Sequence, residues 1–151
     1  MSEPCVIRNA VPEDANHLAR LLLESESGVP LNPQVFHNAF HELLNMSWAC
    51  FIVAENQDTP VGFLLAFIHP TLFSGNAAWV ETVLVARSYQ KQGVGTLLLA
   101  KAERWAADRK AALMAVPAIP SALPFYDRLG YKDAAFRLVK TLGNPFSEKK
   151  R

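Results

Sequence analysis

The sequence predicts a mixed α/β fold, in which helices cover both faces of one mixed sheet. Apolar, β-branched runs that end at turn residues indicate strands, and apolar residues spaced three and four apart indicate helices. These segments follow one another as strand, helix, helix, three strands, helix, strand, helix and two strands. Because one of the last strands is weak, we expect a sheet of six to seven strands. At 151 residues the chain is expected to form a single domain over residues 1–151, with a polar, basic tail at 143–151.

The first third of the chain predicts one strand and two helices. A short strand at 5–8 precedes a helix at 12–24, which starts with a proline that suits the first helical turn. Asn32 followed by Pro33 is typical of an N-cap and a proline at the first helical position. The second helix is therefore expected to run from Pro33 to about Asn45.

The middle of the chain predicts a hairpin, a further strand and a long helix. Strands at 50–55 and 61–69 flank a turn rich in Asn, Asp and Pro. The apolar run at 77–85 indicates the next strand, and the helix after it is expected to end near Lys110. Five apolar residues of this helix are expected to face inward: Val94, Leu97, Leu98, Ala102 and Trp105.

The C-terminal part of the chain predicts one more helix among short strands. A strand at 112–116 precedes a helix at 121–129. Gly130 follows that helix, and glycine suits the left-handed residue with which helices often end. A weak strand at 132–134 and a clearer strand at 136–142 complete the expected sheet.

The most informative stretch is the strand, glycine turn and helix at 80–107. Gly93 and Gly95 stand where the helix begins, so a bulky anion can approach main-chain N–H groups and the positive end of the helix. The Walker pattern is absent because Thr96 follows Gly95 with no lysine between them, and the dinucleotide fingerprint fails at Leu98. The stretch is either a pyrophosphate site or a tight turn that binds nothing.

Composition excludes several classes of function. A net charge of +1 gives no basic field for nucleic acid, and no apolar run has the length of a membrane span. The N-terminus lacks the charged and apolar regions of a secretory signal. Cys5 and Cys50 lie in apolar, strand-like segments, which favours reduced, buried thiols over a disulfide or a nucleophile. Together these features predict a cytoplasmic protein.

A metal site is not expected. His37 and His41 lie four residues apart on a predicted helix, so they could share a metal ion. The chain has no H-E-x-x-H frame there and no obvious third ligand, and a surface pair is the favoured interpretation.

Four segments, in order along the chain, resemble the GNAT superfamily of acyl-CoA-dependent N-acetyltransferases. Residues 90–95, Gln-Lys-Gln-Gly-Val-Gly, resemble its pyrophosphate loop, [RQ]-x-x-G-x-[GA]. Residues 122–131 match its A-x-x-F-Y-x-x-x-G-[FY] segment. Residues 7–14 resemble its opening strand and first helix, and residues 81–85 resemble its fourth strand. The resemblance covers about residues 4–142.

The resemblance implies a mostly antiparallel sheet whose fourth and fifth strands are parallel and splay apart. A bulge in the fourth strand opens the cleft in that family, and acyl-CoA lies in it, so main-chain groups of Val83 and Val85 would take the pantetheine amides. The implied co-substrate is acetyl-CoA, with no metal. The residues implied to bind it are Val83, Leu84, Val85, Gln90, Lys91, Gln92, Gly93, Val94, Gly95, Thr96, Phe125 and Tyr126.

Glu81 is the candidate general base. It stands in an otherwise apolar strand, where a carboxylate is costly unless it is paired or hydrated. Strict alternation would place Glu81 on one face with Val83 and Val85. Carboxylates at this position act as the base in members of the family, often through water. The alternative is a strand residue that reaches solvent or pairs with a lysine or arginine.

Tyr126 is the candidate general acid. A phenol has a pKa near that of a thiol leaving group, so it can protonate a thiolate without being ionised at rest. It lies where the family's thiolate-protonating tyrosine lies. The alternative is that Tyr126 only packs against the cofactor sulfur.

Two positions depart from the family pattern. Ile119 occupies the place of an asparagine that bonds the pantetheine in many members, so that contact is in doubt. Gln90 occupies the place of the more common arginine. It offers its backbone N–H but no charge, and Lys91 is the neighbouring cation.

The sequence and the resemblance together predict an N-acetyltransferase that transfers an acetyl group to a primary amine by direct attack in a ternary complex. The acceptor would be a small molecule or a peptide, with neither nucleic acid nor a membrane as partner. His69 and Phe73 are candidates for an acceptor pocket. Glu24 and Glu26 are candidates for attracting an amine, and the alternative is that these charges in a solvated loop do nothing specific. Dimers are common in the family, often through the C-terminal strands. The alternatives are an acyl-CoA-binding module without turnover, another acyl group, or a hydroxyl acceptor.

Overall fold

The computed structural model describes residues 3–25, 30–134 and 140–143. By the density of its internal contacts the chain divides into two compact units, residues 1–117 and 118–151. The first unit contains the whole sheet and three long helices. Within the described residues, no helix is both long enough and apolar enough to cross a lipid bilayer.

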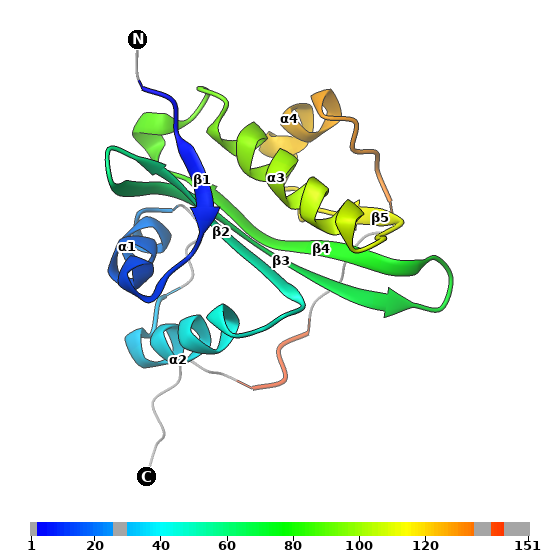
Figure 1. Cartoon of the computed structure of the whole chain (residues 1–151), viewed down its shortest axis with the longest axis horizontal. Helices are drawn as coiled ribbons and strands as arrows, with labels where there is room; N and C mark the ends of the chain where they lie inside the picture. The colour runs from blue at the N-terminus through cyan, green and yellow to red at the C-terminus, as the bar shows by residue number, and fades with distance from the viewer. Residues whose placement is uncertain (1–2, 26–29, 135–139, 144–151) are drawn as a thin grey trace. The chain divides into compact units, whose positions relative to one another are not determined.

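The sheet of the first unit holds its strands in the order in which they follow along the chain (Figure 1). The strands are β1 (Val6–Asn9), β2 (Ala49–Asn56), β3 (Thr59–Thr71), β4 (Gly75–Val85) and β5 (Leu113–Ala115). Neighbours are antiparallel except for β4 and β5, which are parallel. The sheet is therefore mixed and mostly antiparallel, as the family resemblance implies.

The strand count differs from the prediction. The described residues form five strands rather than six to seven. Residues 132–134, where a weak strand was expected, have no strand structure. Of the strand expected at 136–142, residues 136–139 lie outside the described residues, and residues 140–142 are not in a strand.

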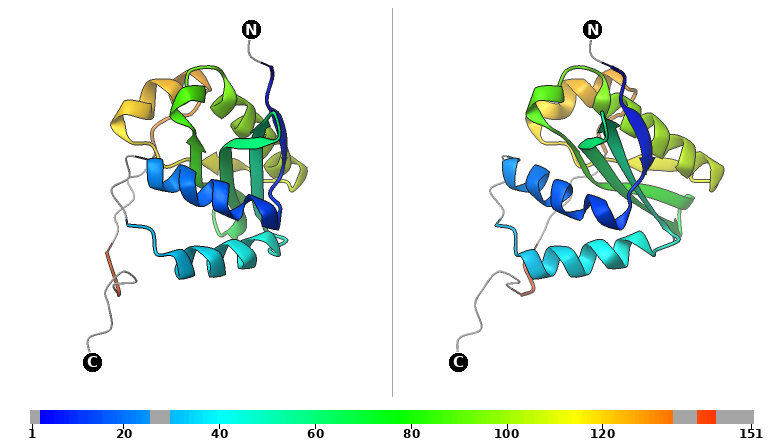
Figure 2. Two further views of the ribbon diagram at one scale, coloured as in Figure 1. Left: turned by 90° about the vertical axis from the view of Figure 1, so that its left-hand side faces the viewer. Right: turned by 60° about the vertical axis from the view of Figure 1, so that its left-hand side comes forward.

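Helices cover both faces of the sheet, as predicted. α1 (Ala15–Glu24), which follows a short 3₁₀ turn, and α2 (Pro33–Leu44) lie on one face, and α3 (Val94–Asp108) lies on the other (Figure 2). The predicted cap at Asn32 is present, since its side chain accepts hydrogen bonds from the N–H groups of Gln34 and Val35.

Two apolar layers fill the space between helices and sheet. Leu18 and Phe40 pack with Val53 and Phe63 beneath α1 and α2, and all four are almost fully buried. On α3 the buried residues are Val94, Leu98, Leu99, Ala102 and Ala106. Leu97, which was expected to face inward, is 45% exposed, because the buried stripe of α3 runs through Leu98 and Leu99.

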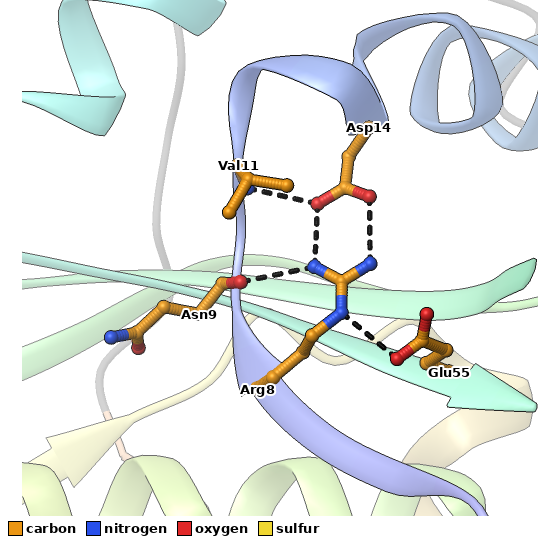
Figure 3. Close-up of polar contacts among 5 residues, drawn as sticks. All are labelled: Arg8, Asn9, Val11, Asp14 and Glu55. Atoms are coloured by element: carbon orange, nitrogen blue, oxygen red, sulfur yellow. Dashed lines mark hydrogen bonds and ion pairs between the residues drawn. The ribbon is translucent and has the colours of Figure 1, made fainter. Parts of the chain in front are cut away.

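A polar cluster joins the first strand to the first helix (Figure 3). The guanidinium of Arg8 donates two hydrogen bonds of 2.8 Å to the buried carboxylate of Asp14, and its Nε donates to Glu55 at 3.1 Å. Asp14 also accepts from the N–H of Val11 at 2.9 Å. Burial alone would raise the pKa of Asp14, but these hydrogen bonds outweigh it and lower the pKa. The cluster ties β1, β2 and the entry to α1 together.

The hairpin of β3 and β4 extends beyond the rest of the sheet (Figure 1). Pairing of β2 with β3 ends at Ala49 and Phe67, yet β3 continues to Thr71. The turn is held by the Thr71 hydroxyl, which accepts from the N–H of Ser74 at 3.1 Å and donates to the carbonyl of Gly75 at 2.7 Å. The strand predicted to end at residue 69 is therefore too short, because β3 continues to Thr71.

The second unit contains a 3₁₀ turn, Pro120–Ala122, and the short helix α4, Leu123–Arg128. Gly130 follows with φ of +91°, as predicted for the residue that ends the helix. The ring of Tyr126 contacts the rings of Phe125 and Tyr131, with centroids 5.1 and 5.6 Å apart.

Candidate functional site

The loop between β4 and α3 presents the start of a helix to solvent. Gly93 is the N-cap of α3 with φ of +86°, and no side chain among the described residues caps the helix there. The first helical bond runs from the N–H of Leu97 to the carbonyl of Gly93. The N–H groups of Val94, Gly95 and Thr96 precede that bond, so they point out of the helix end. This is an anion-binding arrangement with the positive end of the helix dipole behind it.

The backbone of the loop is held in an uncommon conformation. Lys91 has φ of +61°, in the left-handed region that non-glycine residues seldom adopt. A β-carbon at Gly93 would have no atom within 4 Å, so the space beside it is open to a ligand. A strained, non-glycine residue next to open space is a common mark of a functional loop.

Two glutamine side chains brace this loop from within. The side-chain amide of Gln90 donates to the carbonyl of Val85 at 3.0 Å, and that of Gln92 donates to the carbonyl of Ser88 at 2.9 Å. Both amides therefore support the loop, and its main-chain N–H groups remain the donors it offers to a ligand. The side chain of Lys91 is exposed, and among cationic residues Lys91 is the nearest in sequence to Gly93.

Among the described residues, no strand pairs with the outer edge of β4 beside the loop. In the part of the chain that the structure describes, β5 pairs with β4 only from Ala77 to Trp79, and the pairing ends there. The N–H of Ala86 bonds to the carbonyl of Val61 on β3 at 2.7 Å. Because bonding directions alternate along an antiparallel pair, the N–H and C=O groups of Val83 and Val85 point to the other edge, away from β3. That is the edge that β5 has left, so a ligand with amide groups can pair there.

A β-bulge lies at Glu81. Leu65 is opposite Thr82, but the next residue of β3, Ala66, is opposite Val80, so the register skips Glu81. The strict alternation expected for Glu81, Val83 and Val85 consequently does not carry across this point. Glu81 is exposed, and four residues of strand, ~13 Å, separate it from Val85.

A cavity of about 480 Å³ adjoins the open end of β4. Its walls come from the end of α1, the end of β4 and the following loop, and include Leu21, Glu24, Leu84, Val85, Arg87 and Gln90. The carboxylate of Glu24 and the negative end of the α1 dipole favour a cation on one side. Arg87, which also lines the cavity, supplies the opposite charge. Sequence reasoning missed Arg87, whose only signal is that it is a cation in the turn just before the glycine loop.

Tyr126 is buried on α4, and burial raises the pKa of its phenol. The hydroxyl is therefore protonated at neutral pH and is able to donate a proton. Burial likewise raises the pKa of the Cys50 thiol to about 11, and it raises the pKa of Cys5. Both cysteines are thus thiols rather than thiolates at neutral pH, which makes them poor nucleophiles.

The remaining sequence candidates lie elsewhere, except Glu26, which falls outside the described residues. In the described part of the chain, His, Cys, Asp and Glu side chains do not gather in any group of three or more that could hold a metal ion. Phe73 is fully exposed at the tip of the β3–β4 hairpin. His69 lines a second cavity near the far end of β4, about nine residues of strand from Val85.

Comparisons with known proteins identify the family to which the chain is similar. A model of the acetyltransferase (GNAT) family matches residues 16–131. No curated protein sequence matches the chain significantly.

Solved structures with similar folds include a transcriptional regulator from Bacillus halodurans C-125, at 27% identity and a TM-score of 0.85, with 91% of this chain and 99% of that chain covered. A glucosamine-6-phosphate N-acetyltransferase from Arabidopsis thaliana has 15% identity and a TM-score of 0.81, with coverage of 93% and 100%. The aminoglycoside N-acetyltransferase AAC(6')-Iy in complex with CoA has 19% identity and a TM-score of 0.79, with coverage of 91% and 93%.

Proposed function

The chain belongs to the acetyltransferase (GNAT) family, and on that premise we propose that it transfers the acetyl group of acetyl-CoA to a primary amine of a small molecule or peptide. The reaction is a direct attack within a ternary complex, and the cytoplasm is its proposed compartment. The observation that carries the proposal is the uncapped start of α3 beside the open edge of β4.

The geometry of the first unit fits the two parts of an acyl-CoA. The N–H groups of Val94, Gly95 and Thr96 suit a pyrophosphate, with the cation of Lys91 beside them. The outward main-chain groups of Val83 and Val85 suit a chain with amide groups, as pantetheine has. Acetyl-CoA supplies an activated acyl group on a good leaving group. The structurally similar AAC(6')-Iy was solved in complex with CoA, which supports the same donor here.

Three groups are proposed to act on the acceptor, the acyl carbonyl and the leaving group. Glu81, exposed at the bulge, accepts a proton from the ammonium of the acceptor, directly or through water, because only a neutral amine has a lone pair for attack. The main-chain N–H of Val85 or Val83 polarises the acyl carbonyl. As the C–S bond breaks, Tyr126 donates its phenolic proton to the departing thiolate, and the phenolate regains through water the second proton that the nitrogen loses when the amide forms.

The cavity beside the loop supports an amine as the acceptor. Glu24 and the end of α1 form its negative side. An ammonium group would be attracted there before it loses its proton. The names of the two structurally similar transferases refer to glucosamine-6-phosphate and to aminoglycosides, which both carry amines, and this is consistent with that class of acceptor.

The experiment that tests this function is isothermal titration of the protein with acetyl-CoA and with free CoA. We expect saturable binding of both, and a loss of at least tenfold in affinity for Gly93→Val, since the branched side chain enters the space that a pyrophosphate needs. Gly75→Val is the matched control. Gly75 also has positive φ and open space around its missing β-carbon, but it lies in the β3–β4 turn.

A screen of primary amines for release of free thiol follows the titration. Thiol release with an amine supports the transferase. Binding without turnover across the panel would favour an acyl-CoA-binding module, and equal binding by Gly93→Val and wild type would contradict the assignment of the loop.

A further inference from the structure

We propose that Tyr89 and Asn56 are positioning residues for the binding of acyl-CoA, because the hydrogen bond between their side chains holds the glycine loop to the sheet. The Tyr89 hydroxyl donates to the Oδ1 atom of Asn56 at 3.2 Å, across 33 positions of the sequence. Neither residue belongs to the loop at 90–95 that the resemblance singles out. The inference rests on the proposed function and adds two residues that support it from outside the loop.

Tyr89 ends the short turn through which the chain enters the loop. The turn, η2 (Arg87–Tyr89), is a single 3₁₀ turn between the end of β4 and Gln90. The N–H of Tyr89 bonds to the carbonyl of Ala86 at 2.8 Å, and the N–H of Gln90 bonds to the carbonyl of Arg87 at 3.3 Å. So short a turn depends on side-chain contacts for its orientation, because it has few hydrogen bonds of its own.

Asn56 is a firm support for this contact. It is the last residue of β2, it is 8% exposed, and it pairs with Thr59 on β3. The turn between the two strands is tight, since Gln57 and Asp58 both have positive φ. The main chain of Asn56 is therefore fixed by a hairpin in the middle of the sheet.

A third partner sets the direction of the hydrogen bond. The side-chain Nδ2 of Asn56 donates to the carbonyl of Glu3 at 2.9 Å. A carbonyl only accepts, so the amino group of the Asn56 side chain faces Glu3 and its oxygen faces Tyr89. The Tyr89 hydroxyl is therefore the donor, and its proton is directed at Asn56. Tyr89 consequently acts on a bound ligand through the loop and not by contact of its hydroxyl with the ligand.

Two adjacent residues thus hold the loop to two different strands. Gln90 donates to the carbonyl of Val85 at the end of β4, and Tyr89 reaches Asn56 at the end of β2. The N–H groups at 91–93 lie between these bonds and the start of α3, so both ends of that segment are fixed before a ligand binds. A preorganised loop loses less conformational entropy when it binds a pyrophosphate.

The first test is isothermal titration of the full chain and of Tyr89→Phe with acetyl-CoA. This change removes one hydroxyl and keeps the ring. Because 3.2 Å is long for a hydroxyl donor, we expect a loss of roughly twofold to fivefold in affinity. Thr71→Val is the matched control, since it also removes a hydroxyl that holds a turn, at the opposite end of β4, and it should bind as wild type does. Thermal unfolding checks that each variant folds.

Asn56→Ala tests whether Tyr89 acts through Asn56. It should weaken binding by a similar factor. The double variant Tyr89→Phe/Asn56→Ala should bind no more weakly than Asn56→Ala alone, because both changes remove the same bond. With an amine that reacts, KM for acetyl-CoA should rise in Tyr89→Phe while kcat stays unchanged, since the bond serves binding and not the chemical step.

Trypsin cleavage of the free protein tests the loop without any ligand. Lys91 lies in the loop and Lys110 follows α3, and both are exposed with φ of +61°. Cleavage after each lysine requires local opening of the chain around it. Tyr89→Phe should therefore be cut roughly twofold to fivefold faster than wild type after Lys91, and at the wild-type rate after Lys110. A general loss of stability would instead speed cleavage at both lysines.

The outcomes separate this inference from the proposed function. A wild type that does not bind acetyl-CoA overturns both. A wild type that binds, with Tyr89→Phe binding equally well, overturns the inference alone and leaves the proposed function standing. Unchanged cleavage after Lys91, or faster cleavage after both lysines, would also overturn it, as would a double variant whose loss of affinity is the product of the two single losses.

Discussion

The side-chain amide of Gln90 lies 3.0 Å from the carbonyl oxygen of Val85 and donates a hydrogen bond to it. This bond joins the start of the glycine loop to the end of β4, the two parts of the proposed acyl-CoA site. The resemblance to the family leads one to expect arginine at this position, whose role would be a charge for the phosphate. In this chain the residue holds the loop to the strand.

Replacement of Gln90 should therefore alter affinity for acetyl-CoA through loop geometry. A single hydrogen bond contributes about 0.5–1.5 kcal/mol, so Gln90→Ala is expected to weaken binding by roughly twofold to tenfold. Gln90→Arg, which keeps a donor and adds a charge, should bind at least as tightly as wild type, with a steeper dependence on salt. Titration of each variant with acetyl-CoA at two ionic strengths measures the affinity and its dependence on salt. Wild-type affinity in Gln90→Ala would show that the bond to Val85 does not position the loop.

Glu81→Gln should lower kcat/KM by about 10²–10⁴, the usual contribution of a general base. Glutamine cannot accept the proton of the acceptor ammonium, so the pH–rate profile of Glu81→Gln should differ from that of the wild type. The measurement is a pH–rate profile for the best amine found. Glu103→Gln, an exposed carboxylate on α3, is the control and should keep the wild-type profile. An unshifted profile in Glu81→Gln would remove Glu81 from the mechanism.

Tyr126→Phe should slow turnover by about 10²-fold or more while acetyl-CoA affinity changes little, because the hydroxyl is needed only for the leaving group. Burial raises the pKa of Tyr126, so the phenol holds its proton at neutral and mildly alkaline pH, and activity should fall only above its ordinary pKa. The free energy of unfolding should also fall at high pH. The folded state binds the phenolic proton more tightly than the unfolded state does, and the resulting stabilisation is lost as pH rises through the raised pKa. Tyr131→Phe, which removes the hydroxyl of the neighbouring ring and keeps the ring contact with Tyr126, is the control.

Asp14→Asn should destabilise the protein by about 2–3 kcal/mol at neutral pH, because Arg8 and the N–H of Val11 lose a charged acceptor. The pKa of Asp14 is lowered in the folded state, so its contribution is present above the ordinary carboxyl pKa. It is lost as pH falls through the lowered value. Urea unfolding at neutral and at acid pH should show a large difference between wild type and Asp14→Asn only at neutral pH. Asp127→Asn, whose carboxylate is exposed and 3.8 Å from Lys132, should cost little at either pH.

Gly62→Ala should destabilise the sheet by roughly 1–3 kcal/mol. A β-carbon at Gly62 would lie 2.9 Å from the carbonyl oxygen of Leu84 on β4, a contact that only a shift of the strands can relieve. Gly143→Ala meets no atom within 4 Å and should be neutral in the same unfolding experiment. Equal stability of the two variants would show that β3 and β4 can separate here at no cost.

Much of the fold could be predicted from short stretches of adjacent residues. The cap at Asn32, the glycine at 130 and the helix start at Gly93 each depend on a few adjacent residues, and the structure has all three. The resemblance drawn from four short segments is confirmed by the family model, which matches residues 16–131. The roles of Glu81, Tyr126 and the loop residues stay predictions.

Long-range pairing accounts for what the sequence did not reveal. The bulge at Glu81 arises from the register between β3 and β4, which no local pattern encodes, so alternation was extended across it wrongly. The ion pair of Arg8 and Asp14 joins residues on different elements, and neither residue type signals burial. The predicted β3–β4 hairpin was too short because His69 and Pro70 resemble loop residues, although proline is compatible with the edge of a strand.

The bulge also bears on which changes of length this chain can accept. β4 has one residue more than β3 requires over the same span, so deletion of residue 81 would leave both halves of the strand in their present register. Deletion of most other residues of β4 would turn buried side chains to the opposite face. The ladder does not depend on the residue proposed to carry the chemistry, so descendants of this chain can lose or exchange that carboxylate while they keep the same sheet.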